Sequence, residues 1–220
     1  MSLSPDNTQI LSSDRMGTGD VIIHSTSSNK VEYRAQNALP GDVLDVCFLP
    51  NNNKGIVICG GDSYAGYDGA GDVYGPNLRV FSPSLELVQT LVGHGDPNPV
   101  NCVTVSPTGS HFASGGGDKK VMIWSEPGEG GEWARVQVLE DHTDAILAVC
   151  FSPDGKQLAT GSWGSLMTYS FNEGSAIIAH SLKGHTSYVR SLSFSPDCKL
   201  LCSGSDDESI KFWNPAMEAW

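Results

Sequence analysis

One short pattern recurs along this chain and constrains its fold more than any other feature. An apolar run, a turn that contains proline, and a second run ending in small residues occur five times, as in VTVSPTGSHFASGG, VCFSPDGKQLATGS and LSFSPDCKLLCSGS. The five prolines are spaced 45, 57, 46 and 43 residues apart, at Pro5, Pro50, Pro107, Pro153 and Pro196. A period of this length indicates a repeat architecture, so five units of one kind make up nearly the whole chain.

Each unit has the pattern of β-structure. In the fifth, an alternating run over 189–194 is followed by a turn, a second run over 199–203, a tight turn and a third run over 209–213. A fourth run precedes the next unit, at 85–91, 134–139 and 176–182. Four short strands per unit predict four-stranded antiparallel blades, and stacked blades predict an all-β propeller. We expect one propeller region over 1–220, with units of approximately 1–40, 41–92, 93–140, 141–183 and 184–220.

The units resemble the WD-repeat, or G-beta-like, propeller family. The family's Gly-His dipeptide is present as Gly93-His94 and Gly184-His185, with Asp141-His142 as a variant. Its Asp and Trp, separated by five residues, are present in GGGDKKVMIW and SGSDDESIKFW, and GHTSYVRSLSFSPDCKLLCSGSDDESIKFW matches a whole unit. Several matches in phase are far more specific than a single motif.

The resemblance implies a buried hydrogen-bonded tetrad in the well-kept blades. A turn aspartate accepts from a histidine, the histidine donates to a strand hydroxyl, and the hydroxyl meets a Trp N–H, so each polar group is satisfied by the next. The implied tetrads are His94, Ser114, Asp118 and Trp124 in the third unit and His185, Ser203, Asp207 and Trp213 in the fifth.

The other units depart from this pattern. The fourth keeps His142 and Thr160, but Gly164 and Ser170 stand where the family has Asp and Trp, so this blade is expected to be softer. The first and second units have no Gly-His dipeptide and place His24 and Phe81 at the Trp position.

The recurrence of Ser, His and Asp is interpreted as structural, because a catalytic triad needs one set beside an open pocket. The sequence has no G-x-S-x-G elbow, P-loop or H-E-x-x-H motif. We therefore predict a non-catalytic interaction scaffold or adaptor with protein partners and no cofactor. The alternative is a propeller that binds a small ligand, or acts as an enzyme, through the central channel or the loop 60–75.

In WD-repeat proteins, partners usually bind the face formed by the loops that carry the Gly-His dipeptide and the tight turn. Trp163 is at a turn tip, where the fifth unit has Asp206, and Trp is the commonest hot-spot residue. The hypothesis also includes Tyr188 and Arg190, with Leu147 and Asn101 at the positions equivalent to Arg190 in the fourth and third units. The alternative is that Trp163 packs over a neighbouring blade.

The segment GGDSYAGYDGAGDVYG (60–75) lengthens a turn that is two or three residues long in the other units. Its glycines lack dinucleotide-loop spacing and a following helix, and its aspartates lack calcium-loop spacing and a bidentate Glu. A tolerated insertion is the favoured interpretation, with Tyr64, Tyr67 and Tyr74 as further candidates for partner contact.

Composition narrows the partners and the compartment. Thirteen Lys and Arg against 25 Asp and Glu give a net charge of −12, which disfavours nucleic acid and anionic membranes. Cys47 and Cys150 occupy equivalent positions, so they are interpreted as small buried thiols in a reducing compartment, cytoplasmic or nuclear. The CxxxC pair Cys198 and Cys202 gives little support for zinc, and no metal site is predicted.

The number of strands suggests an incomplete ring. The first and fifth units are each expected to have three strands, which favours an open arc of a larger ring that could self-associate: a fragment, a truncated gene product or a chain that completes its ring with another copy. The resemblance implies seven blades for the complete propeller. The alternative is a closed five-bladed ring.

Overall fold

The computed structural model describes residues 1–13, 19–39, 41–50, 55–61, 78–95, 98–126 and 131–214. Strands and turns account for these residues, with no helix among them, and hence none that could span a membrane. The chain forms two compact units, residues 1–103 and 104–220. The all-β class and the four-stranded antiparallel sheets predicted from the repeats are confirmed.

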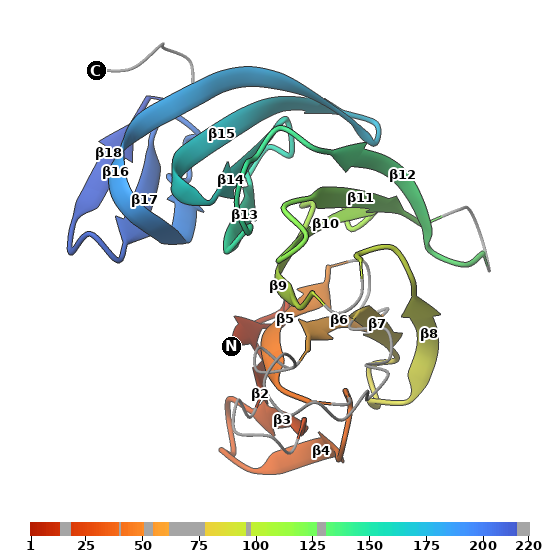
Figure 1. Cartoon of the computed structure of the whole chain (residues 1–220). Helices are drawn as coiled ribbons and strands as arrows, with labels where there is room; N and C mark the ends of the chain where they lie inside the picture. Colours follow the sequence, from red (N-terminus) through yellow and green to blue (C-terminus); the bar gives the residue numbers. More distant parts are fainter. Residues whose placement is uncertain are drawn as a thin grey trace, which may run out of the picture. The chain divides into compact units, whose positions relative to one another are not determined.

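The first compact unit, residues 1–103, contains two four-stranded sheets, and in each the strands neighbour one another in chain order (Figure 1). The first sheet consists of β1 (Ser2–Leu3), β2 (Gln9–Ser13), β3 (Val21–Ser25) and β4 (Val31–Ala35). The second consists of β5 (Val43–Leu49), β6 (Gly55–Gly60), β7 (Leu78–Phe81) and β8 (Leu87–Leu91). Apolar side chains from both sheets form one core, which includes the fully buried Leu11, Ile23, Ile56 and Ile58. Burial of this alternating apolar set holds the two sheets face to face.

The first sheet corrects one prediction. It has four strands and not three, because Ser2 and Leu3 pair with Leu11 and Ile10 across the Pro5 turn. Two residues before the turn are enough to form this short strand. The predicted positions of His24 and Phe81 are confirmed: His24 pairs with Ile10 and Phe81 with Ile56.

The second compact unit, residues 104–220, contains the remaining strands. One four-stranded sheet consists of β9 (Val100–Val105), which straddles the boundary between the units, β10 (His111–Gly116), β11 (Val121–Ser125) and β12 (Ala134–Leu139). A six-stranded sheet consists of β13 (Ala148–Phe151), β14 (Gln157–Gly161), β15 (Trp163–Asn172), β16 (Ser175–Phe194), β17 (Leu201–Ser205) and β18 (Ile210–Trp213).

Strand β16 joins two repeats into one sheet. It contains both the predicted fourth strand of the fourth unit and the predicted first strand of the fifth, and Figure 1 shows it as a long curved ribbon beside β15. Up to Tyr188 it pairs with β15, and from Val189 onward it pairs with β17. The pairing is irregular between Lys183, opposite Ser165, and Tyr188, opposite Trp163. The chain therefore passes from one blade to the next without leaving the extended conformation.

The register of β14 and β15 corrects a second prediction. Phe112 pairs with Trp124, and Leu201 pairs with Trp213. The equivalent Leu158 pairs with Tyr169 and not with Ser170. The connection between the paired residues is one residue shorter in the fourth unit, so Tyr169 takes the structural place of the tryptophan.

Candidate partner surface

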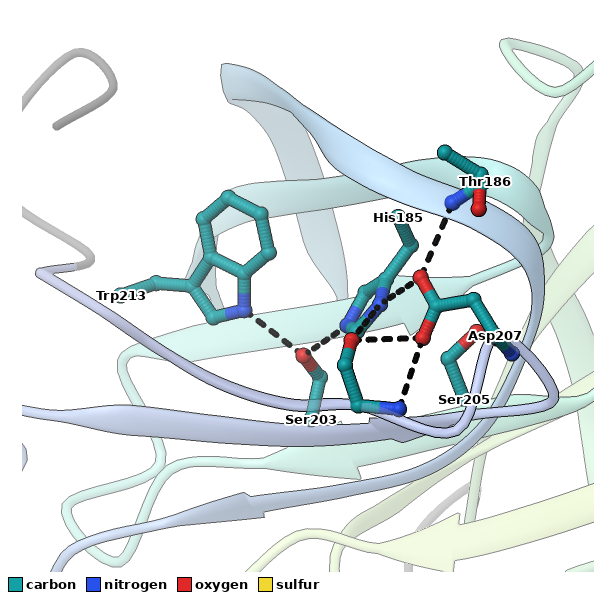
Figure 2. Close-up of polar contacts among 7 residues, drawn as sticks. His185, Thr186, Ser203, Ser205, Asp207 and Trp213 are labelled. Carbon is teal, nitrogen blue, oxygen red and sulfur yellow. Dashed lines mark hydrogen bonds and ion pairs between the residues drawn. The ribbon is translucent and has the colours of Figure 1, made fainter.

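The hydrogen-bond network of the fifth unit lies beneath the turn that joins β17 to β18. The indole N–H of Trp213 donates to Ser203 Oγ at 2.8 Å, and Ser203 Oγ lies 2.7 Å from His185 Nε2. His185 Nδ1 lies 2.8 Å from Asp207 Oδ2, as Figure 2 shows. The Asp207 carboxylate can only accept, so His185 Nδ1 donates to it, and the ring lies between Asp207 and Ser203 as the resemblance implies.

Asp207 organises the turn as well as the network. Its carboxylate also accepts from Thr186 N, Ser209 N and Ser209 Oγ (Figure 2). The hydrogen bond from Ser209 Oγ, together with those from Thr186 N, His185 and Ser209 N, holds the pKa of Asp207 well below its usual range, although burial opposes this shift. The network fixes the turn that precedes β18 and places Asp206 on its outer side.

In the third repeat, one hydrogen bond of the implied tetrad lies within the second compact unit, residues 104–220. The indole N–H of Trp124 donates to Ser114 Oγ at 2.9 Å, and both side chains are buried. Asp118 Oδ1 accepts from Lys120 N in the turn between β10 and β11. His94 belongs to the other compact unit, so its part in this tetrad stays a prediction.

The fourth repeat has a different set of hydrogen bonds from the fifth. His142 Nε2 lies 2.6 Å from Thr160 Oγ1, but Gly164 offers no carboxylate. His142 Nδ1 is buried and has no hydrogen-bond partner among the residues that the structure describes. Tyr169 is 1% exposed and donates its hydroxyl to Asp141 Oδ2 at 3.1 Å. Burial, with the nearby Asp141 charge, raises the pKa of Tyr169. Sequence reasoning missed Tyr169, and the shorter turn was the signal that could have found it.

Burial lowers the pKa of His142 to about 4, although the Asp141 charge opposes this shift. As the pH falls below 6.5 the unfolded chain binds a proton at this residue before the folded chain does. The free energy of unfolding should therefore decrease with falling pH between about 6 and 4.5, by up to about 1.4 kcal/mol per pH unit. Urea titrations at several pH values should show this slope, and His142→Gln should remove most of it. An unchanged slope in the variant would contradict this assignment.

Four of the predicted partner residues form one cluster, Trp163, Tyr188, Arg190 and Asp206, called the Trp163 cluster here. The Trp163 and Tyr188 rings meet edge to face with centroids 4.7 Å apart. The Arg190 guanidinium lies 5.3 Å from the centroid of the Tyr188 ring. Arg190 Nε and Nη2 donate to the Asp206 carboxylate at 2.6 to 2.9 Å. These hydrogen bonds lower the pKa of Asp206.

Backbone hydrogen bonds hold the cluster in place. Val189 N donates to Ser162 O, and Asp206 N donates to Tyr188 O, so the turn before β15, the corner of β16 and the turn after β17 are tied together. Trp163 is the first residue of β15, and the next residue, Gly164, has a φ of +58° and lies against the His185 carbonyl, where a side chain would be crowded. Trp163 stays 50% exposed on this rigid frame.

The other predicted partner residues are not brought into this cluster. Leu147 is half-buried, and its N–H donates to Gly161 O beside the Trp163 turn. Asn101 belongs to the first compact unit. Residues 62–75 of the inserted loop lie outside the described residues, and they include Tyr64, Tyr67 and Tyr74.

The cysteines are free thiols, and Cys59 and Cys102 are buried. Burial raises the pKa of the Cys59 thiol well above its usual range. Cys47 and Cys150 are only half-buried, in equivalent strands β5 and β13. In the described part of the chain, no three His, Cys, Asp or Glu side chains are placed to hold a metal ion.

The four-stranded antiparallel sheets and the Trp–Ser and His–Ser hydrogen bonds define blades of the β-propeller class. The family model for the WD domain, G-beta repeat, matches residues 85–125, 133–169 and 177–214, which is more than half of the chain. The chain belongs to this WD40 repeat family.

Proteins from several organisms are similar to part of this chain. An intraflagellar transport protein 122 homolog of Danio rerio is 30% identical over 58% of this chain and 9% of its own length. A probable cytosolic iron-sulfur protein assembly protein 1 of Sclerotinia sclerotiorum is 36% identical over 37% of this chain and 19% of its own length. An uncharacterised WD repeat-containing protein of Synechocystis is 40% identical over 35% of this chain and 21% of its own length. The matched part of each relative is thus less than a quarter of its length.

Proposed function

We propose that this chain is a non-catalytic protein-interaction scaffold and that the Trp163 cluster forms part of its partner surface. The carrying observation is a half-exposed tryptophan held against Tyr188 by a hydrogen-bonded frame. The ring has already lost much of its rotational freedom, so binding a partner over it costs little additional ordering. Aromatic and Arg side chains in such settings supply most of the binding energy at protein interfaces.

The names of the relatives support the same proposal. One relative is named for intraflagellar transport and another for cytosolic iron-sulfur protein assembly. The first name refers to transport and the second to protein assembly in the cytosol, which favours a scaffold or adaptor with protein partners and a cytoplasmic location. A nuclear location stays a prediction. We place Leu147 at the margin of the proposed surface, because its backbone is bonded to the residue two positions before Trp163.

Trp163→Ala should reduce partner capture without unfolding the chain. The side chain is half-exposed, so its removal leaves the buried networks intact, while a hot-spot tryptophan is worth about 2 kcal/mol or more to binding. The measurement is quantitative affinity purification from cell extract with the wild type, Trp163→Ala and Tyr33→Ala. Tyr33 is a matched control, since it is an exposed aromatic residue (42%) of the first compact unit.

We expect Trp163→Ala to deplete specific proteins that Tyr33→Ala retains, with unchanged circular dichroism for both variants. Identical capture profiles for the wild type and a folded Trp163→Ala variant would refute the role of this surface.

A further inference from the structure

The Trp163 cluster lies at an acidic end of the six-stranded sheet. The register places the start of β13, the turn before β15, the corner of β16 and the turn after β17 at the same end, because Ala148 pairs with Gly161, Trp163 with Tyr188 and Val189 with Ser205. The acids in these segments and in the connection from β12 to β13 outnumber the bases. They are Glu140, Asp141, Asp144, Asp206, Asp207 and Glu208, against Lys183, Arg190 and Lys211, whose side chain lies near Gly184. Glu140 pairs with Lys120 of the neighbouring sheet. The remaining charge at this end is negative, as is that of the chain.

Arg190 does not reverse this sign. Its Nε and Nη2 are both directed at the Asp206 carboxylate, with the shortest contact at 2.6 Å, so the pair is neutral as a whole. An anionic partner would have to compete with Asp206 for the guanidinium. A cationic partner would leave the ion pair intact.

Trp163 offers the complementary contact for a cation. An indole ring attracts ammonium and guanidinium groups to its face, and edge-to-face packing on Tyr188 leaves half of this side chain exposed. Hydrogen bonds connect Asp144 to the residue that precedes Trp163. Asp144 Oδ1 accepts from Ala145 N, and Ala145 O accepts from the hydroxyl of Ser162. An exposed ring and a carboxylate thus occur together beside the neutral Arg190–Asp206 pair.

We infer that the Trp163 cluster binds a basic segment of a partner protein, with a Lys or Arg side chain stacked on Trp163 and its charge near Asp144 and Asp206. This inference rests on the proposed function and adds the chemical class of the partner. Charge complementarity carries it, because the surface combines a half-exposed tryptophan with excess negative charge.

The test uses the purified chain and fluorescein-labelled peptides of alternating arginine and glycine, glutamate and glycine, and serine and glycine. Anisotropy titrations at low ionic strength should show binding of the arginine peptide in preference to the other two. Added salt should weaken it. Trp163→Ala should weaken binding of the arginine peptide about fivefold or more, and Tyr33→Ala should not change it. This comparison separates the cluster from general attraction by the net charge.

Two variants of the ion pair should change the affinity for the arginine peptide in opposite directions. Arg190→Gln frees the Asp206 carboxylate and should tighten binding of the arginine peptide by a few fold, whereas Asp206→Asn frees the guanidinium and should weaken it by about the same factor. Asp144→Asn should also weaken binding. The inference is overturned if Trp163→Ala binds the arginine peptide like the wild type, or if the glutamate peptide binds better and Arg190→Gln abolishes that binding. Partner capture that depends on Trp163 together with either result would leave the proposed function standing and remove only the basic partner.

Discussion

Tyr169→Ala is expected to lower the free energy of unfolding by about 3 to 5 kcal/mol, the usual cost of deleting a large buried aromatic side chain. Tyr169 is 1% exposed, and its hydroxyl donates to Asp141 Oδ2. The substitution would leave a buried cavity and remove the hydrogen bond to Asp141. The measurement is urea unfolding followed by tryptophan fluorescence, since all five Trp residues lie in the second compact unit.

Ser170→Ala is the matched control for Tyr169. Ser170 is exposed on the same strand, so its replacement should change the free energy of unfolding by no more than about 0.5 kcal/mol. Tyr169→Phe should fall between the two, because it keeps the ring and loses only the hydroxyl. A larger effect for Ser170→Ala than for Tyr169→Ala would mean that β14 and β15 pair in the register expected from the family spacing.

Ser203→Ala should cost about 2 to 4 kcal/mol of stability, because one hydroxyl satisfies two buried groups. Ser203 is 1% exposed and bonds both His185 Nε2 and Trp213 Nε1. Without it the indole N–H and the imidazole nitrogen lose their partner in a place that water does not reach. The same fluorescence-detected urea titration measures the loss.

Two further variants distinguish the hydroxyl from its surroundings. Ser193→Ala changes an exposed serine of β16 and should be nearly neutral. Ser203→Thr keeps the hydroxyl and should retain most of the stability that Ser203→Ala loses, since Thr160 occupies the equivalent buried position in β14. If Ser203→Ala were as stable as Ser193→Ala, the network would not contribute to the blade.

Much of the fold could be predicted because its determinants are local. The proline turns recur at a nearly constant spacing, and strand alternation has a period of two, so sheets and blades followed from the pattern. The tetrad of the fifth unit also followed, since Ser203 and Trp213 lie on adjacent strands at a spacing that the family shares. The same reasoning placed His24 and Phe81 correctly.

The error at Tyr169 arose because one residue changes the pairing. A connection shorter by one residue places Tyr169 opposite Leu158, and counting from the family spacing selects Ser170 instead. Side chains alternate across a strand, so a shift of one residue exchanges a buried position for an exposed one. The hydrogen bond from the Tyr169 hydroxyl to Asp141 follows from this shift. The His142 Nδ1, which has no partner among the residues that the structure describes, reflects the glycine at position 164 in place of an aspartate.

The amino-acid sequence identified the repeat, the strands and most of the residues proposed for the partner surface. It could not show that Trp163 meets Tyr188, or that Asp206 neutralises Arg190, because these residues come from separate strands and turns of the six-stranded sheet. Their contacts depend on the corner of β16 and on the hydrogen bonds that tie three connections together. Packing between segments distant in the chain therefore set the charge of this surface, and with it the class of partner that we infer.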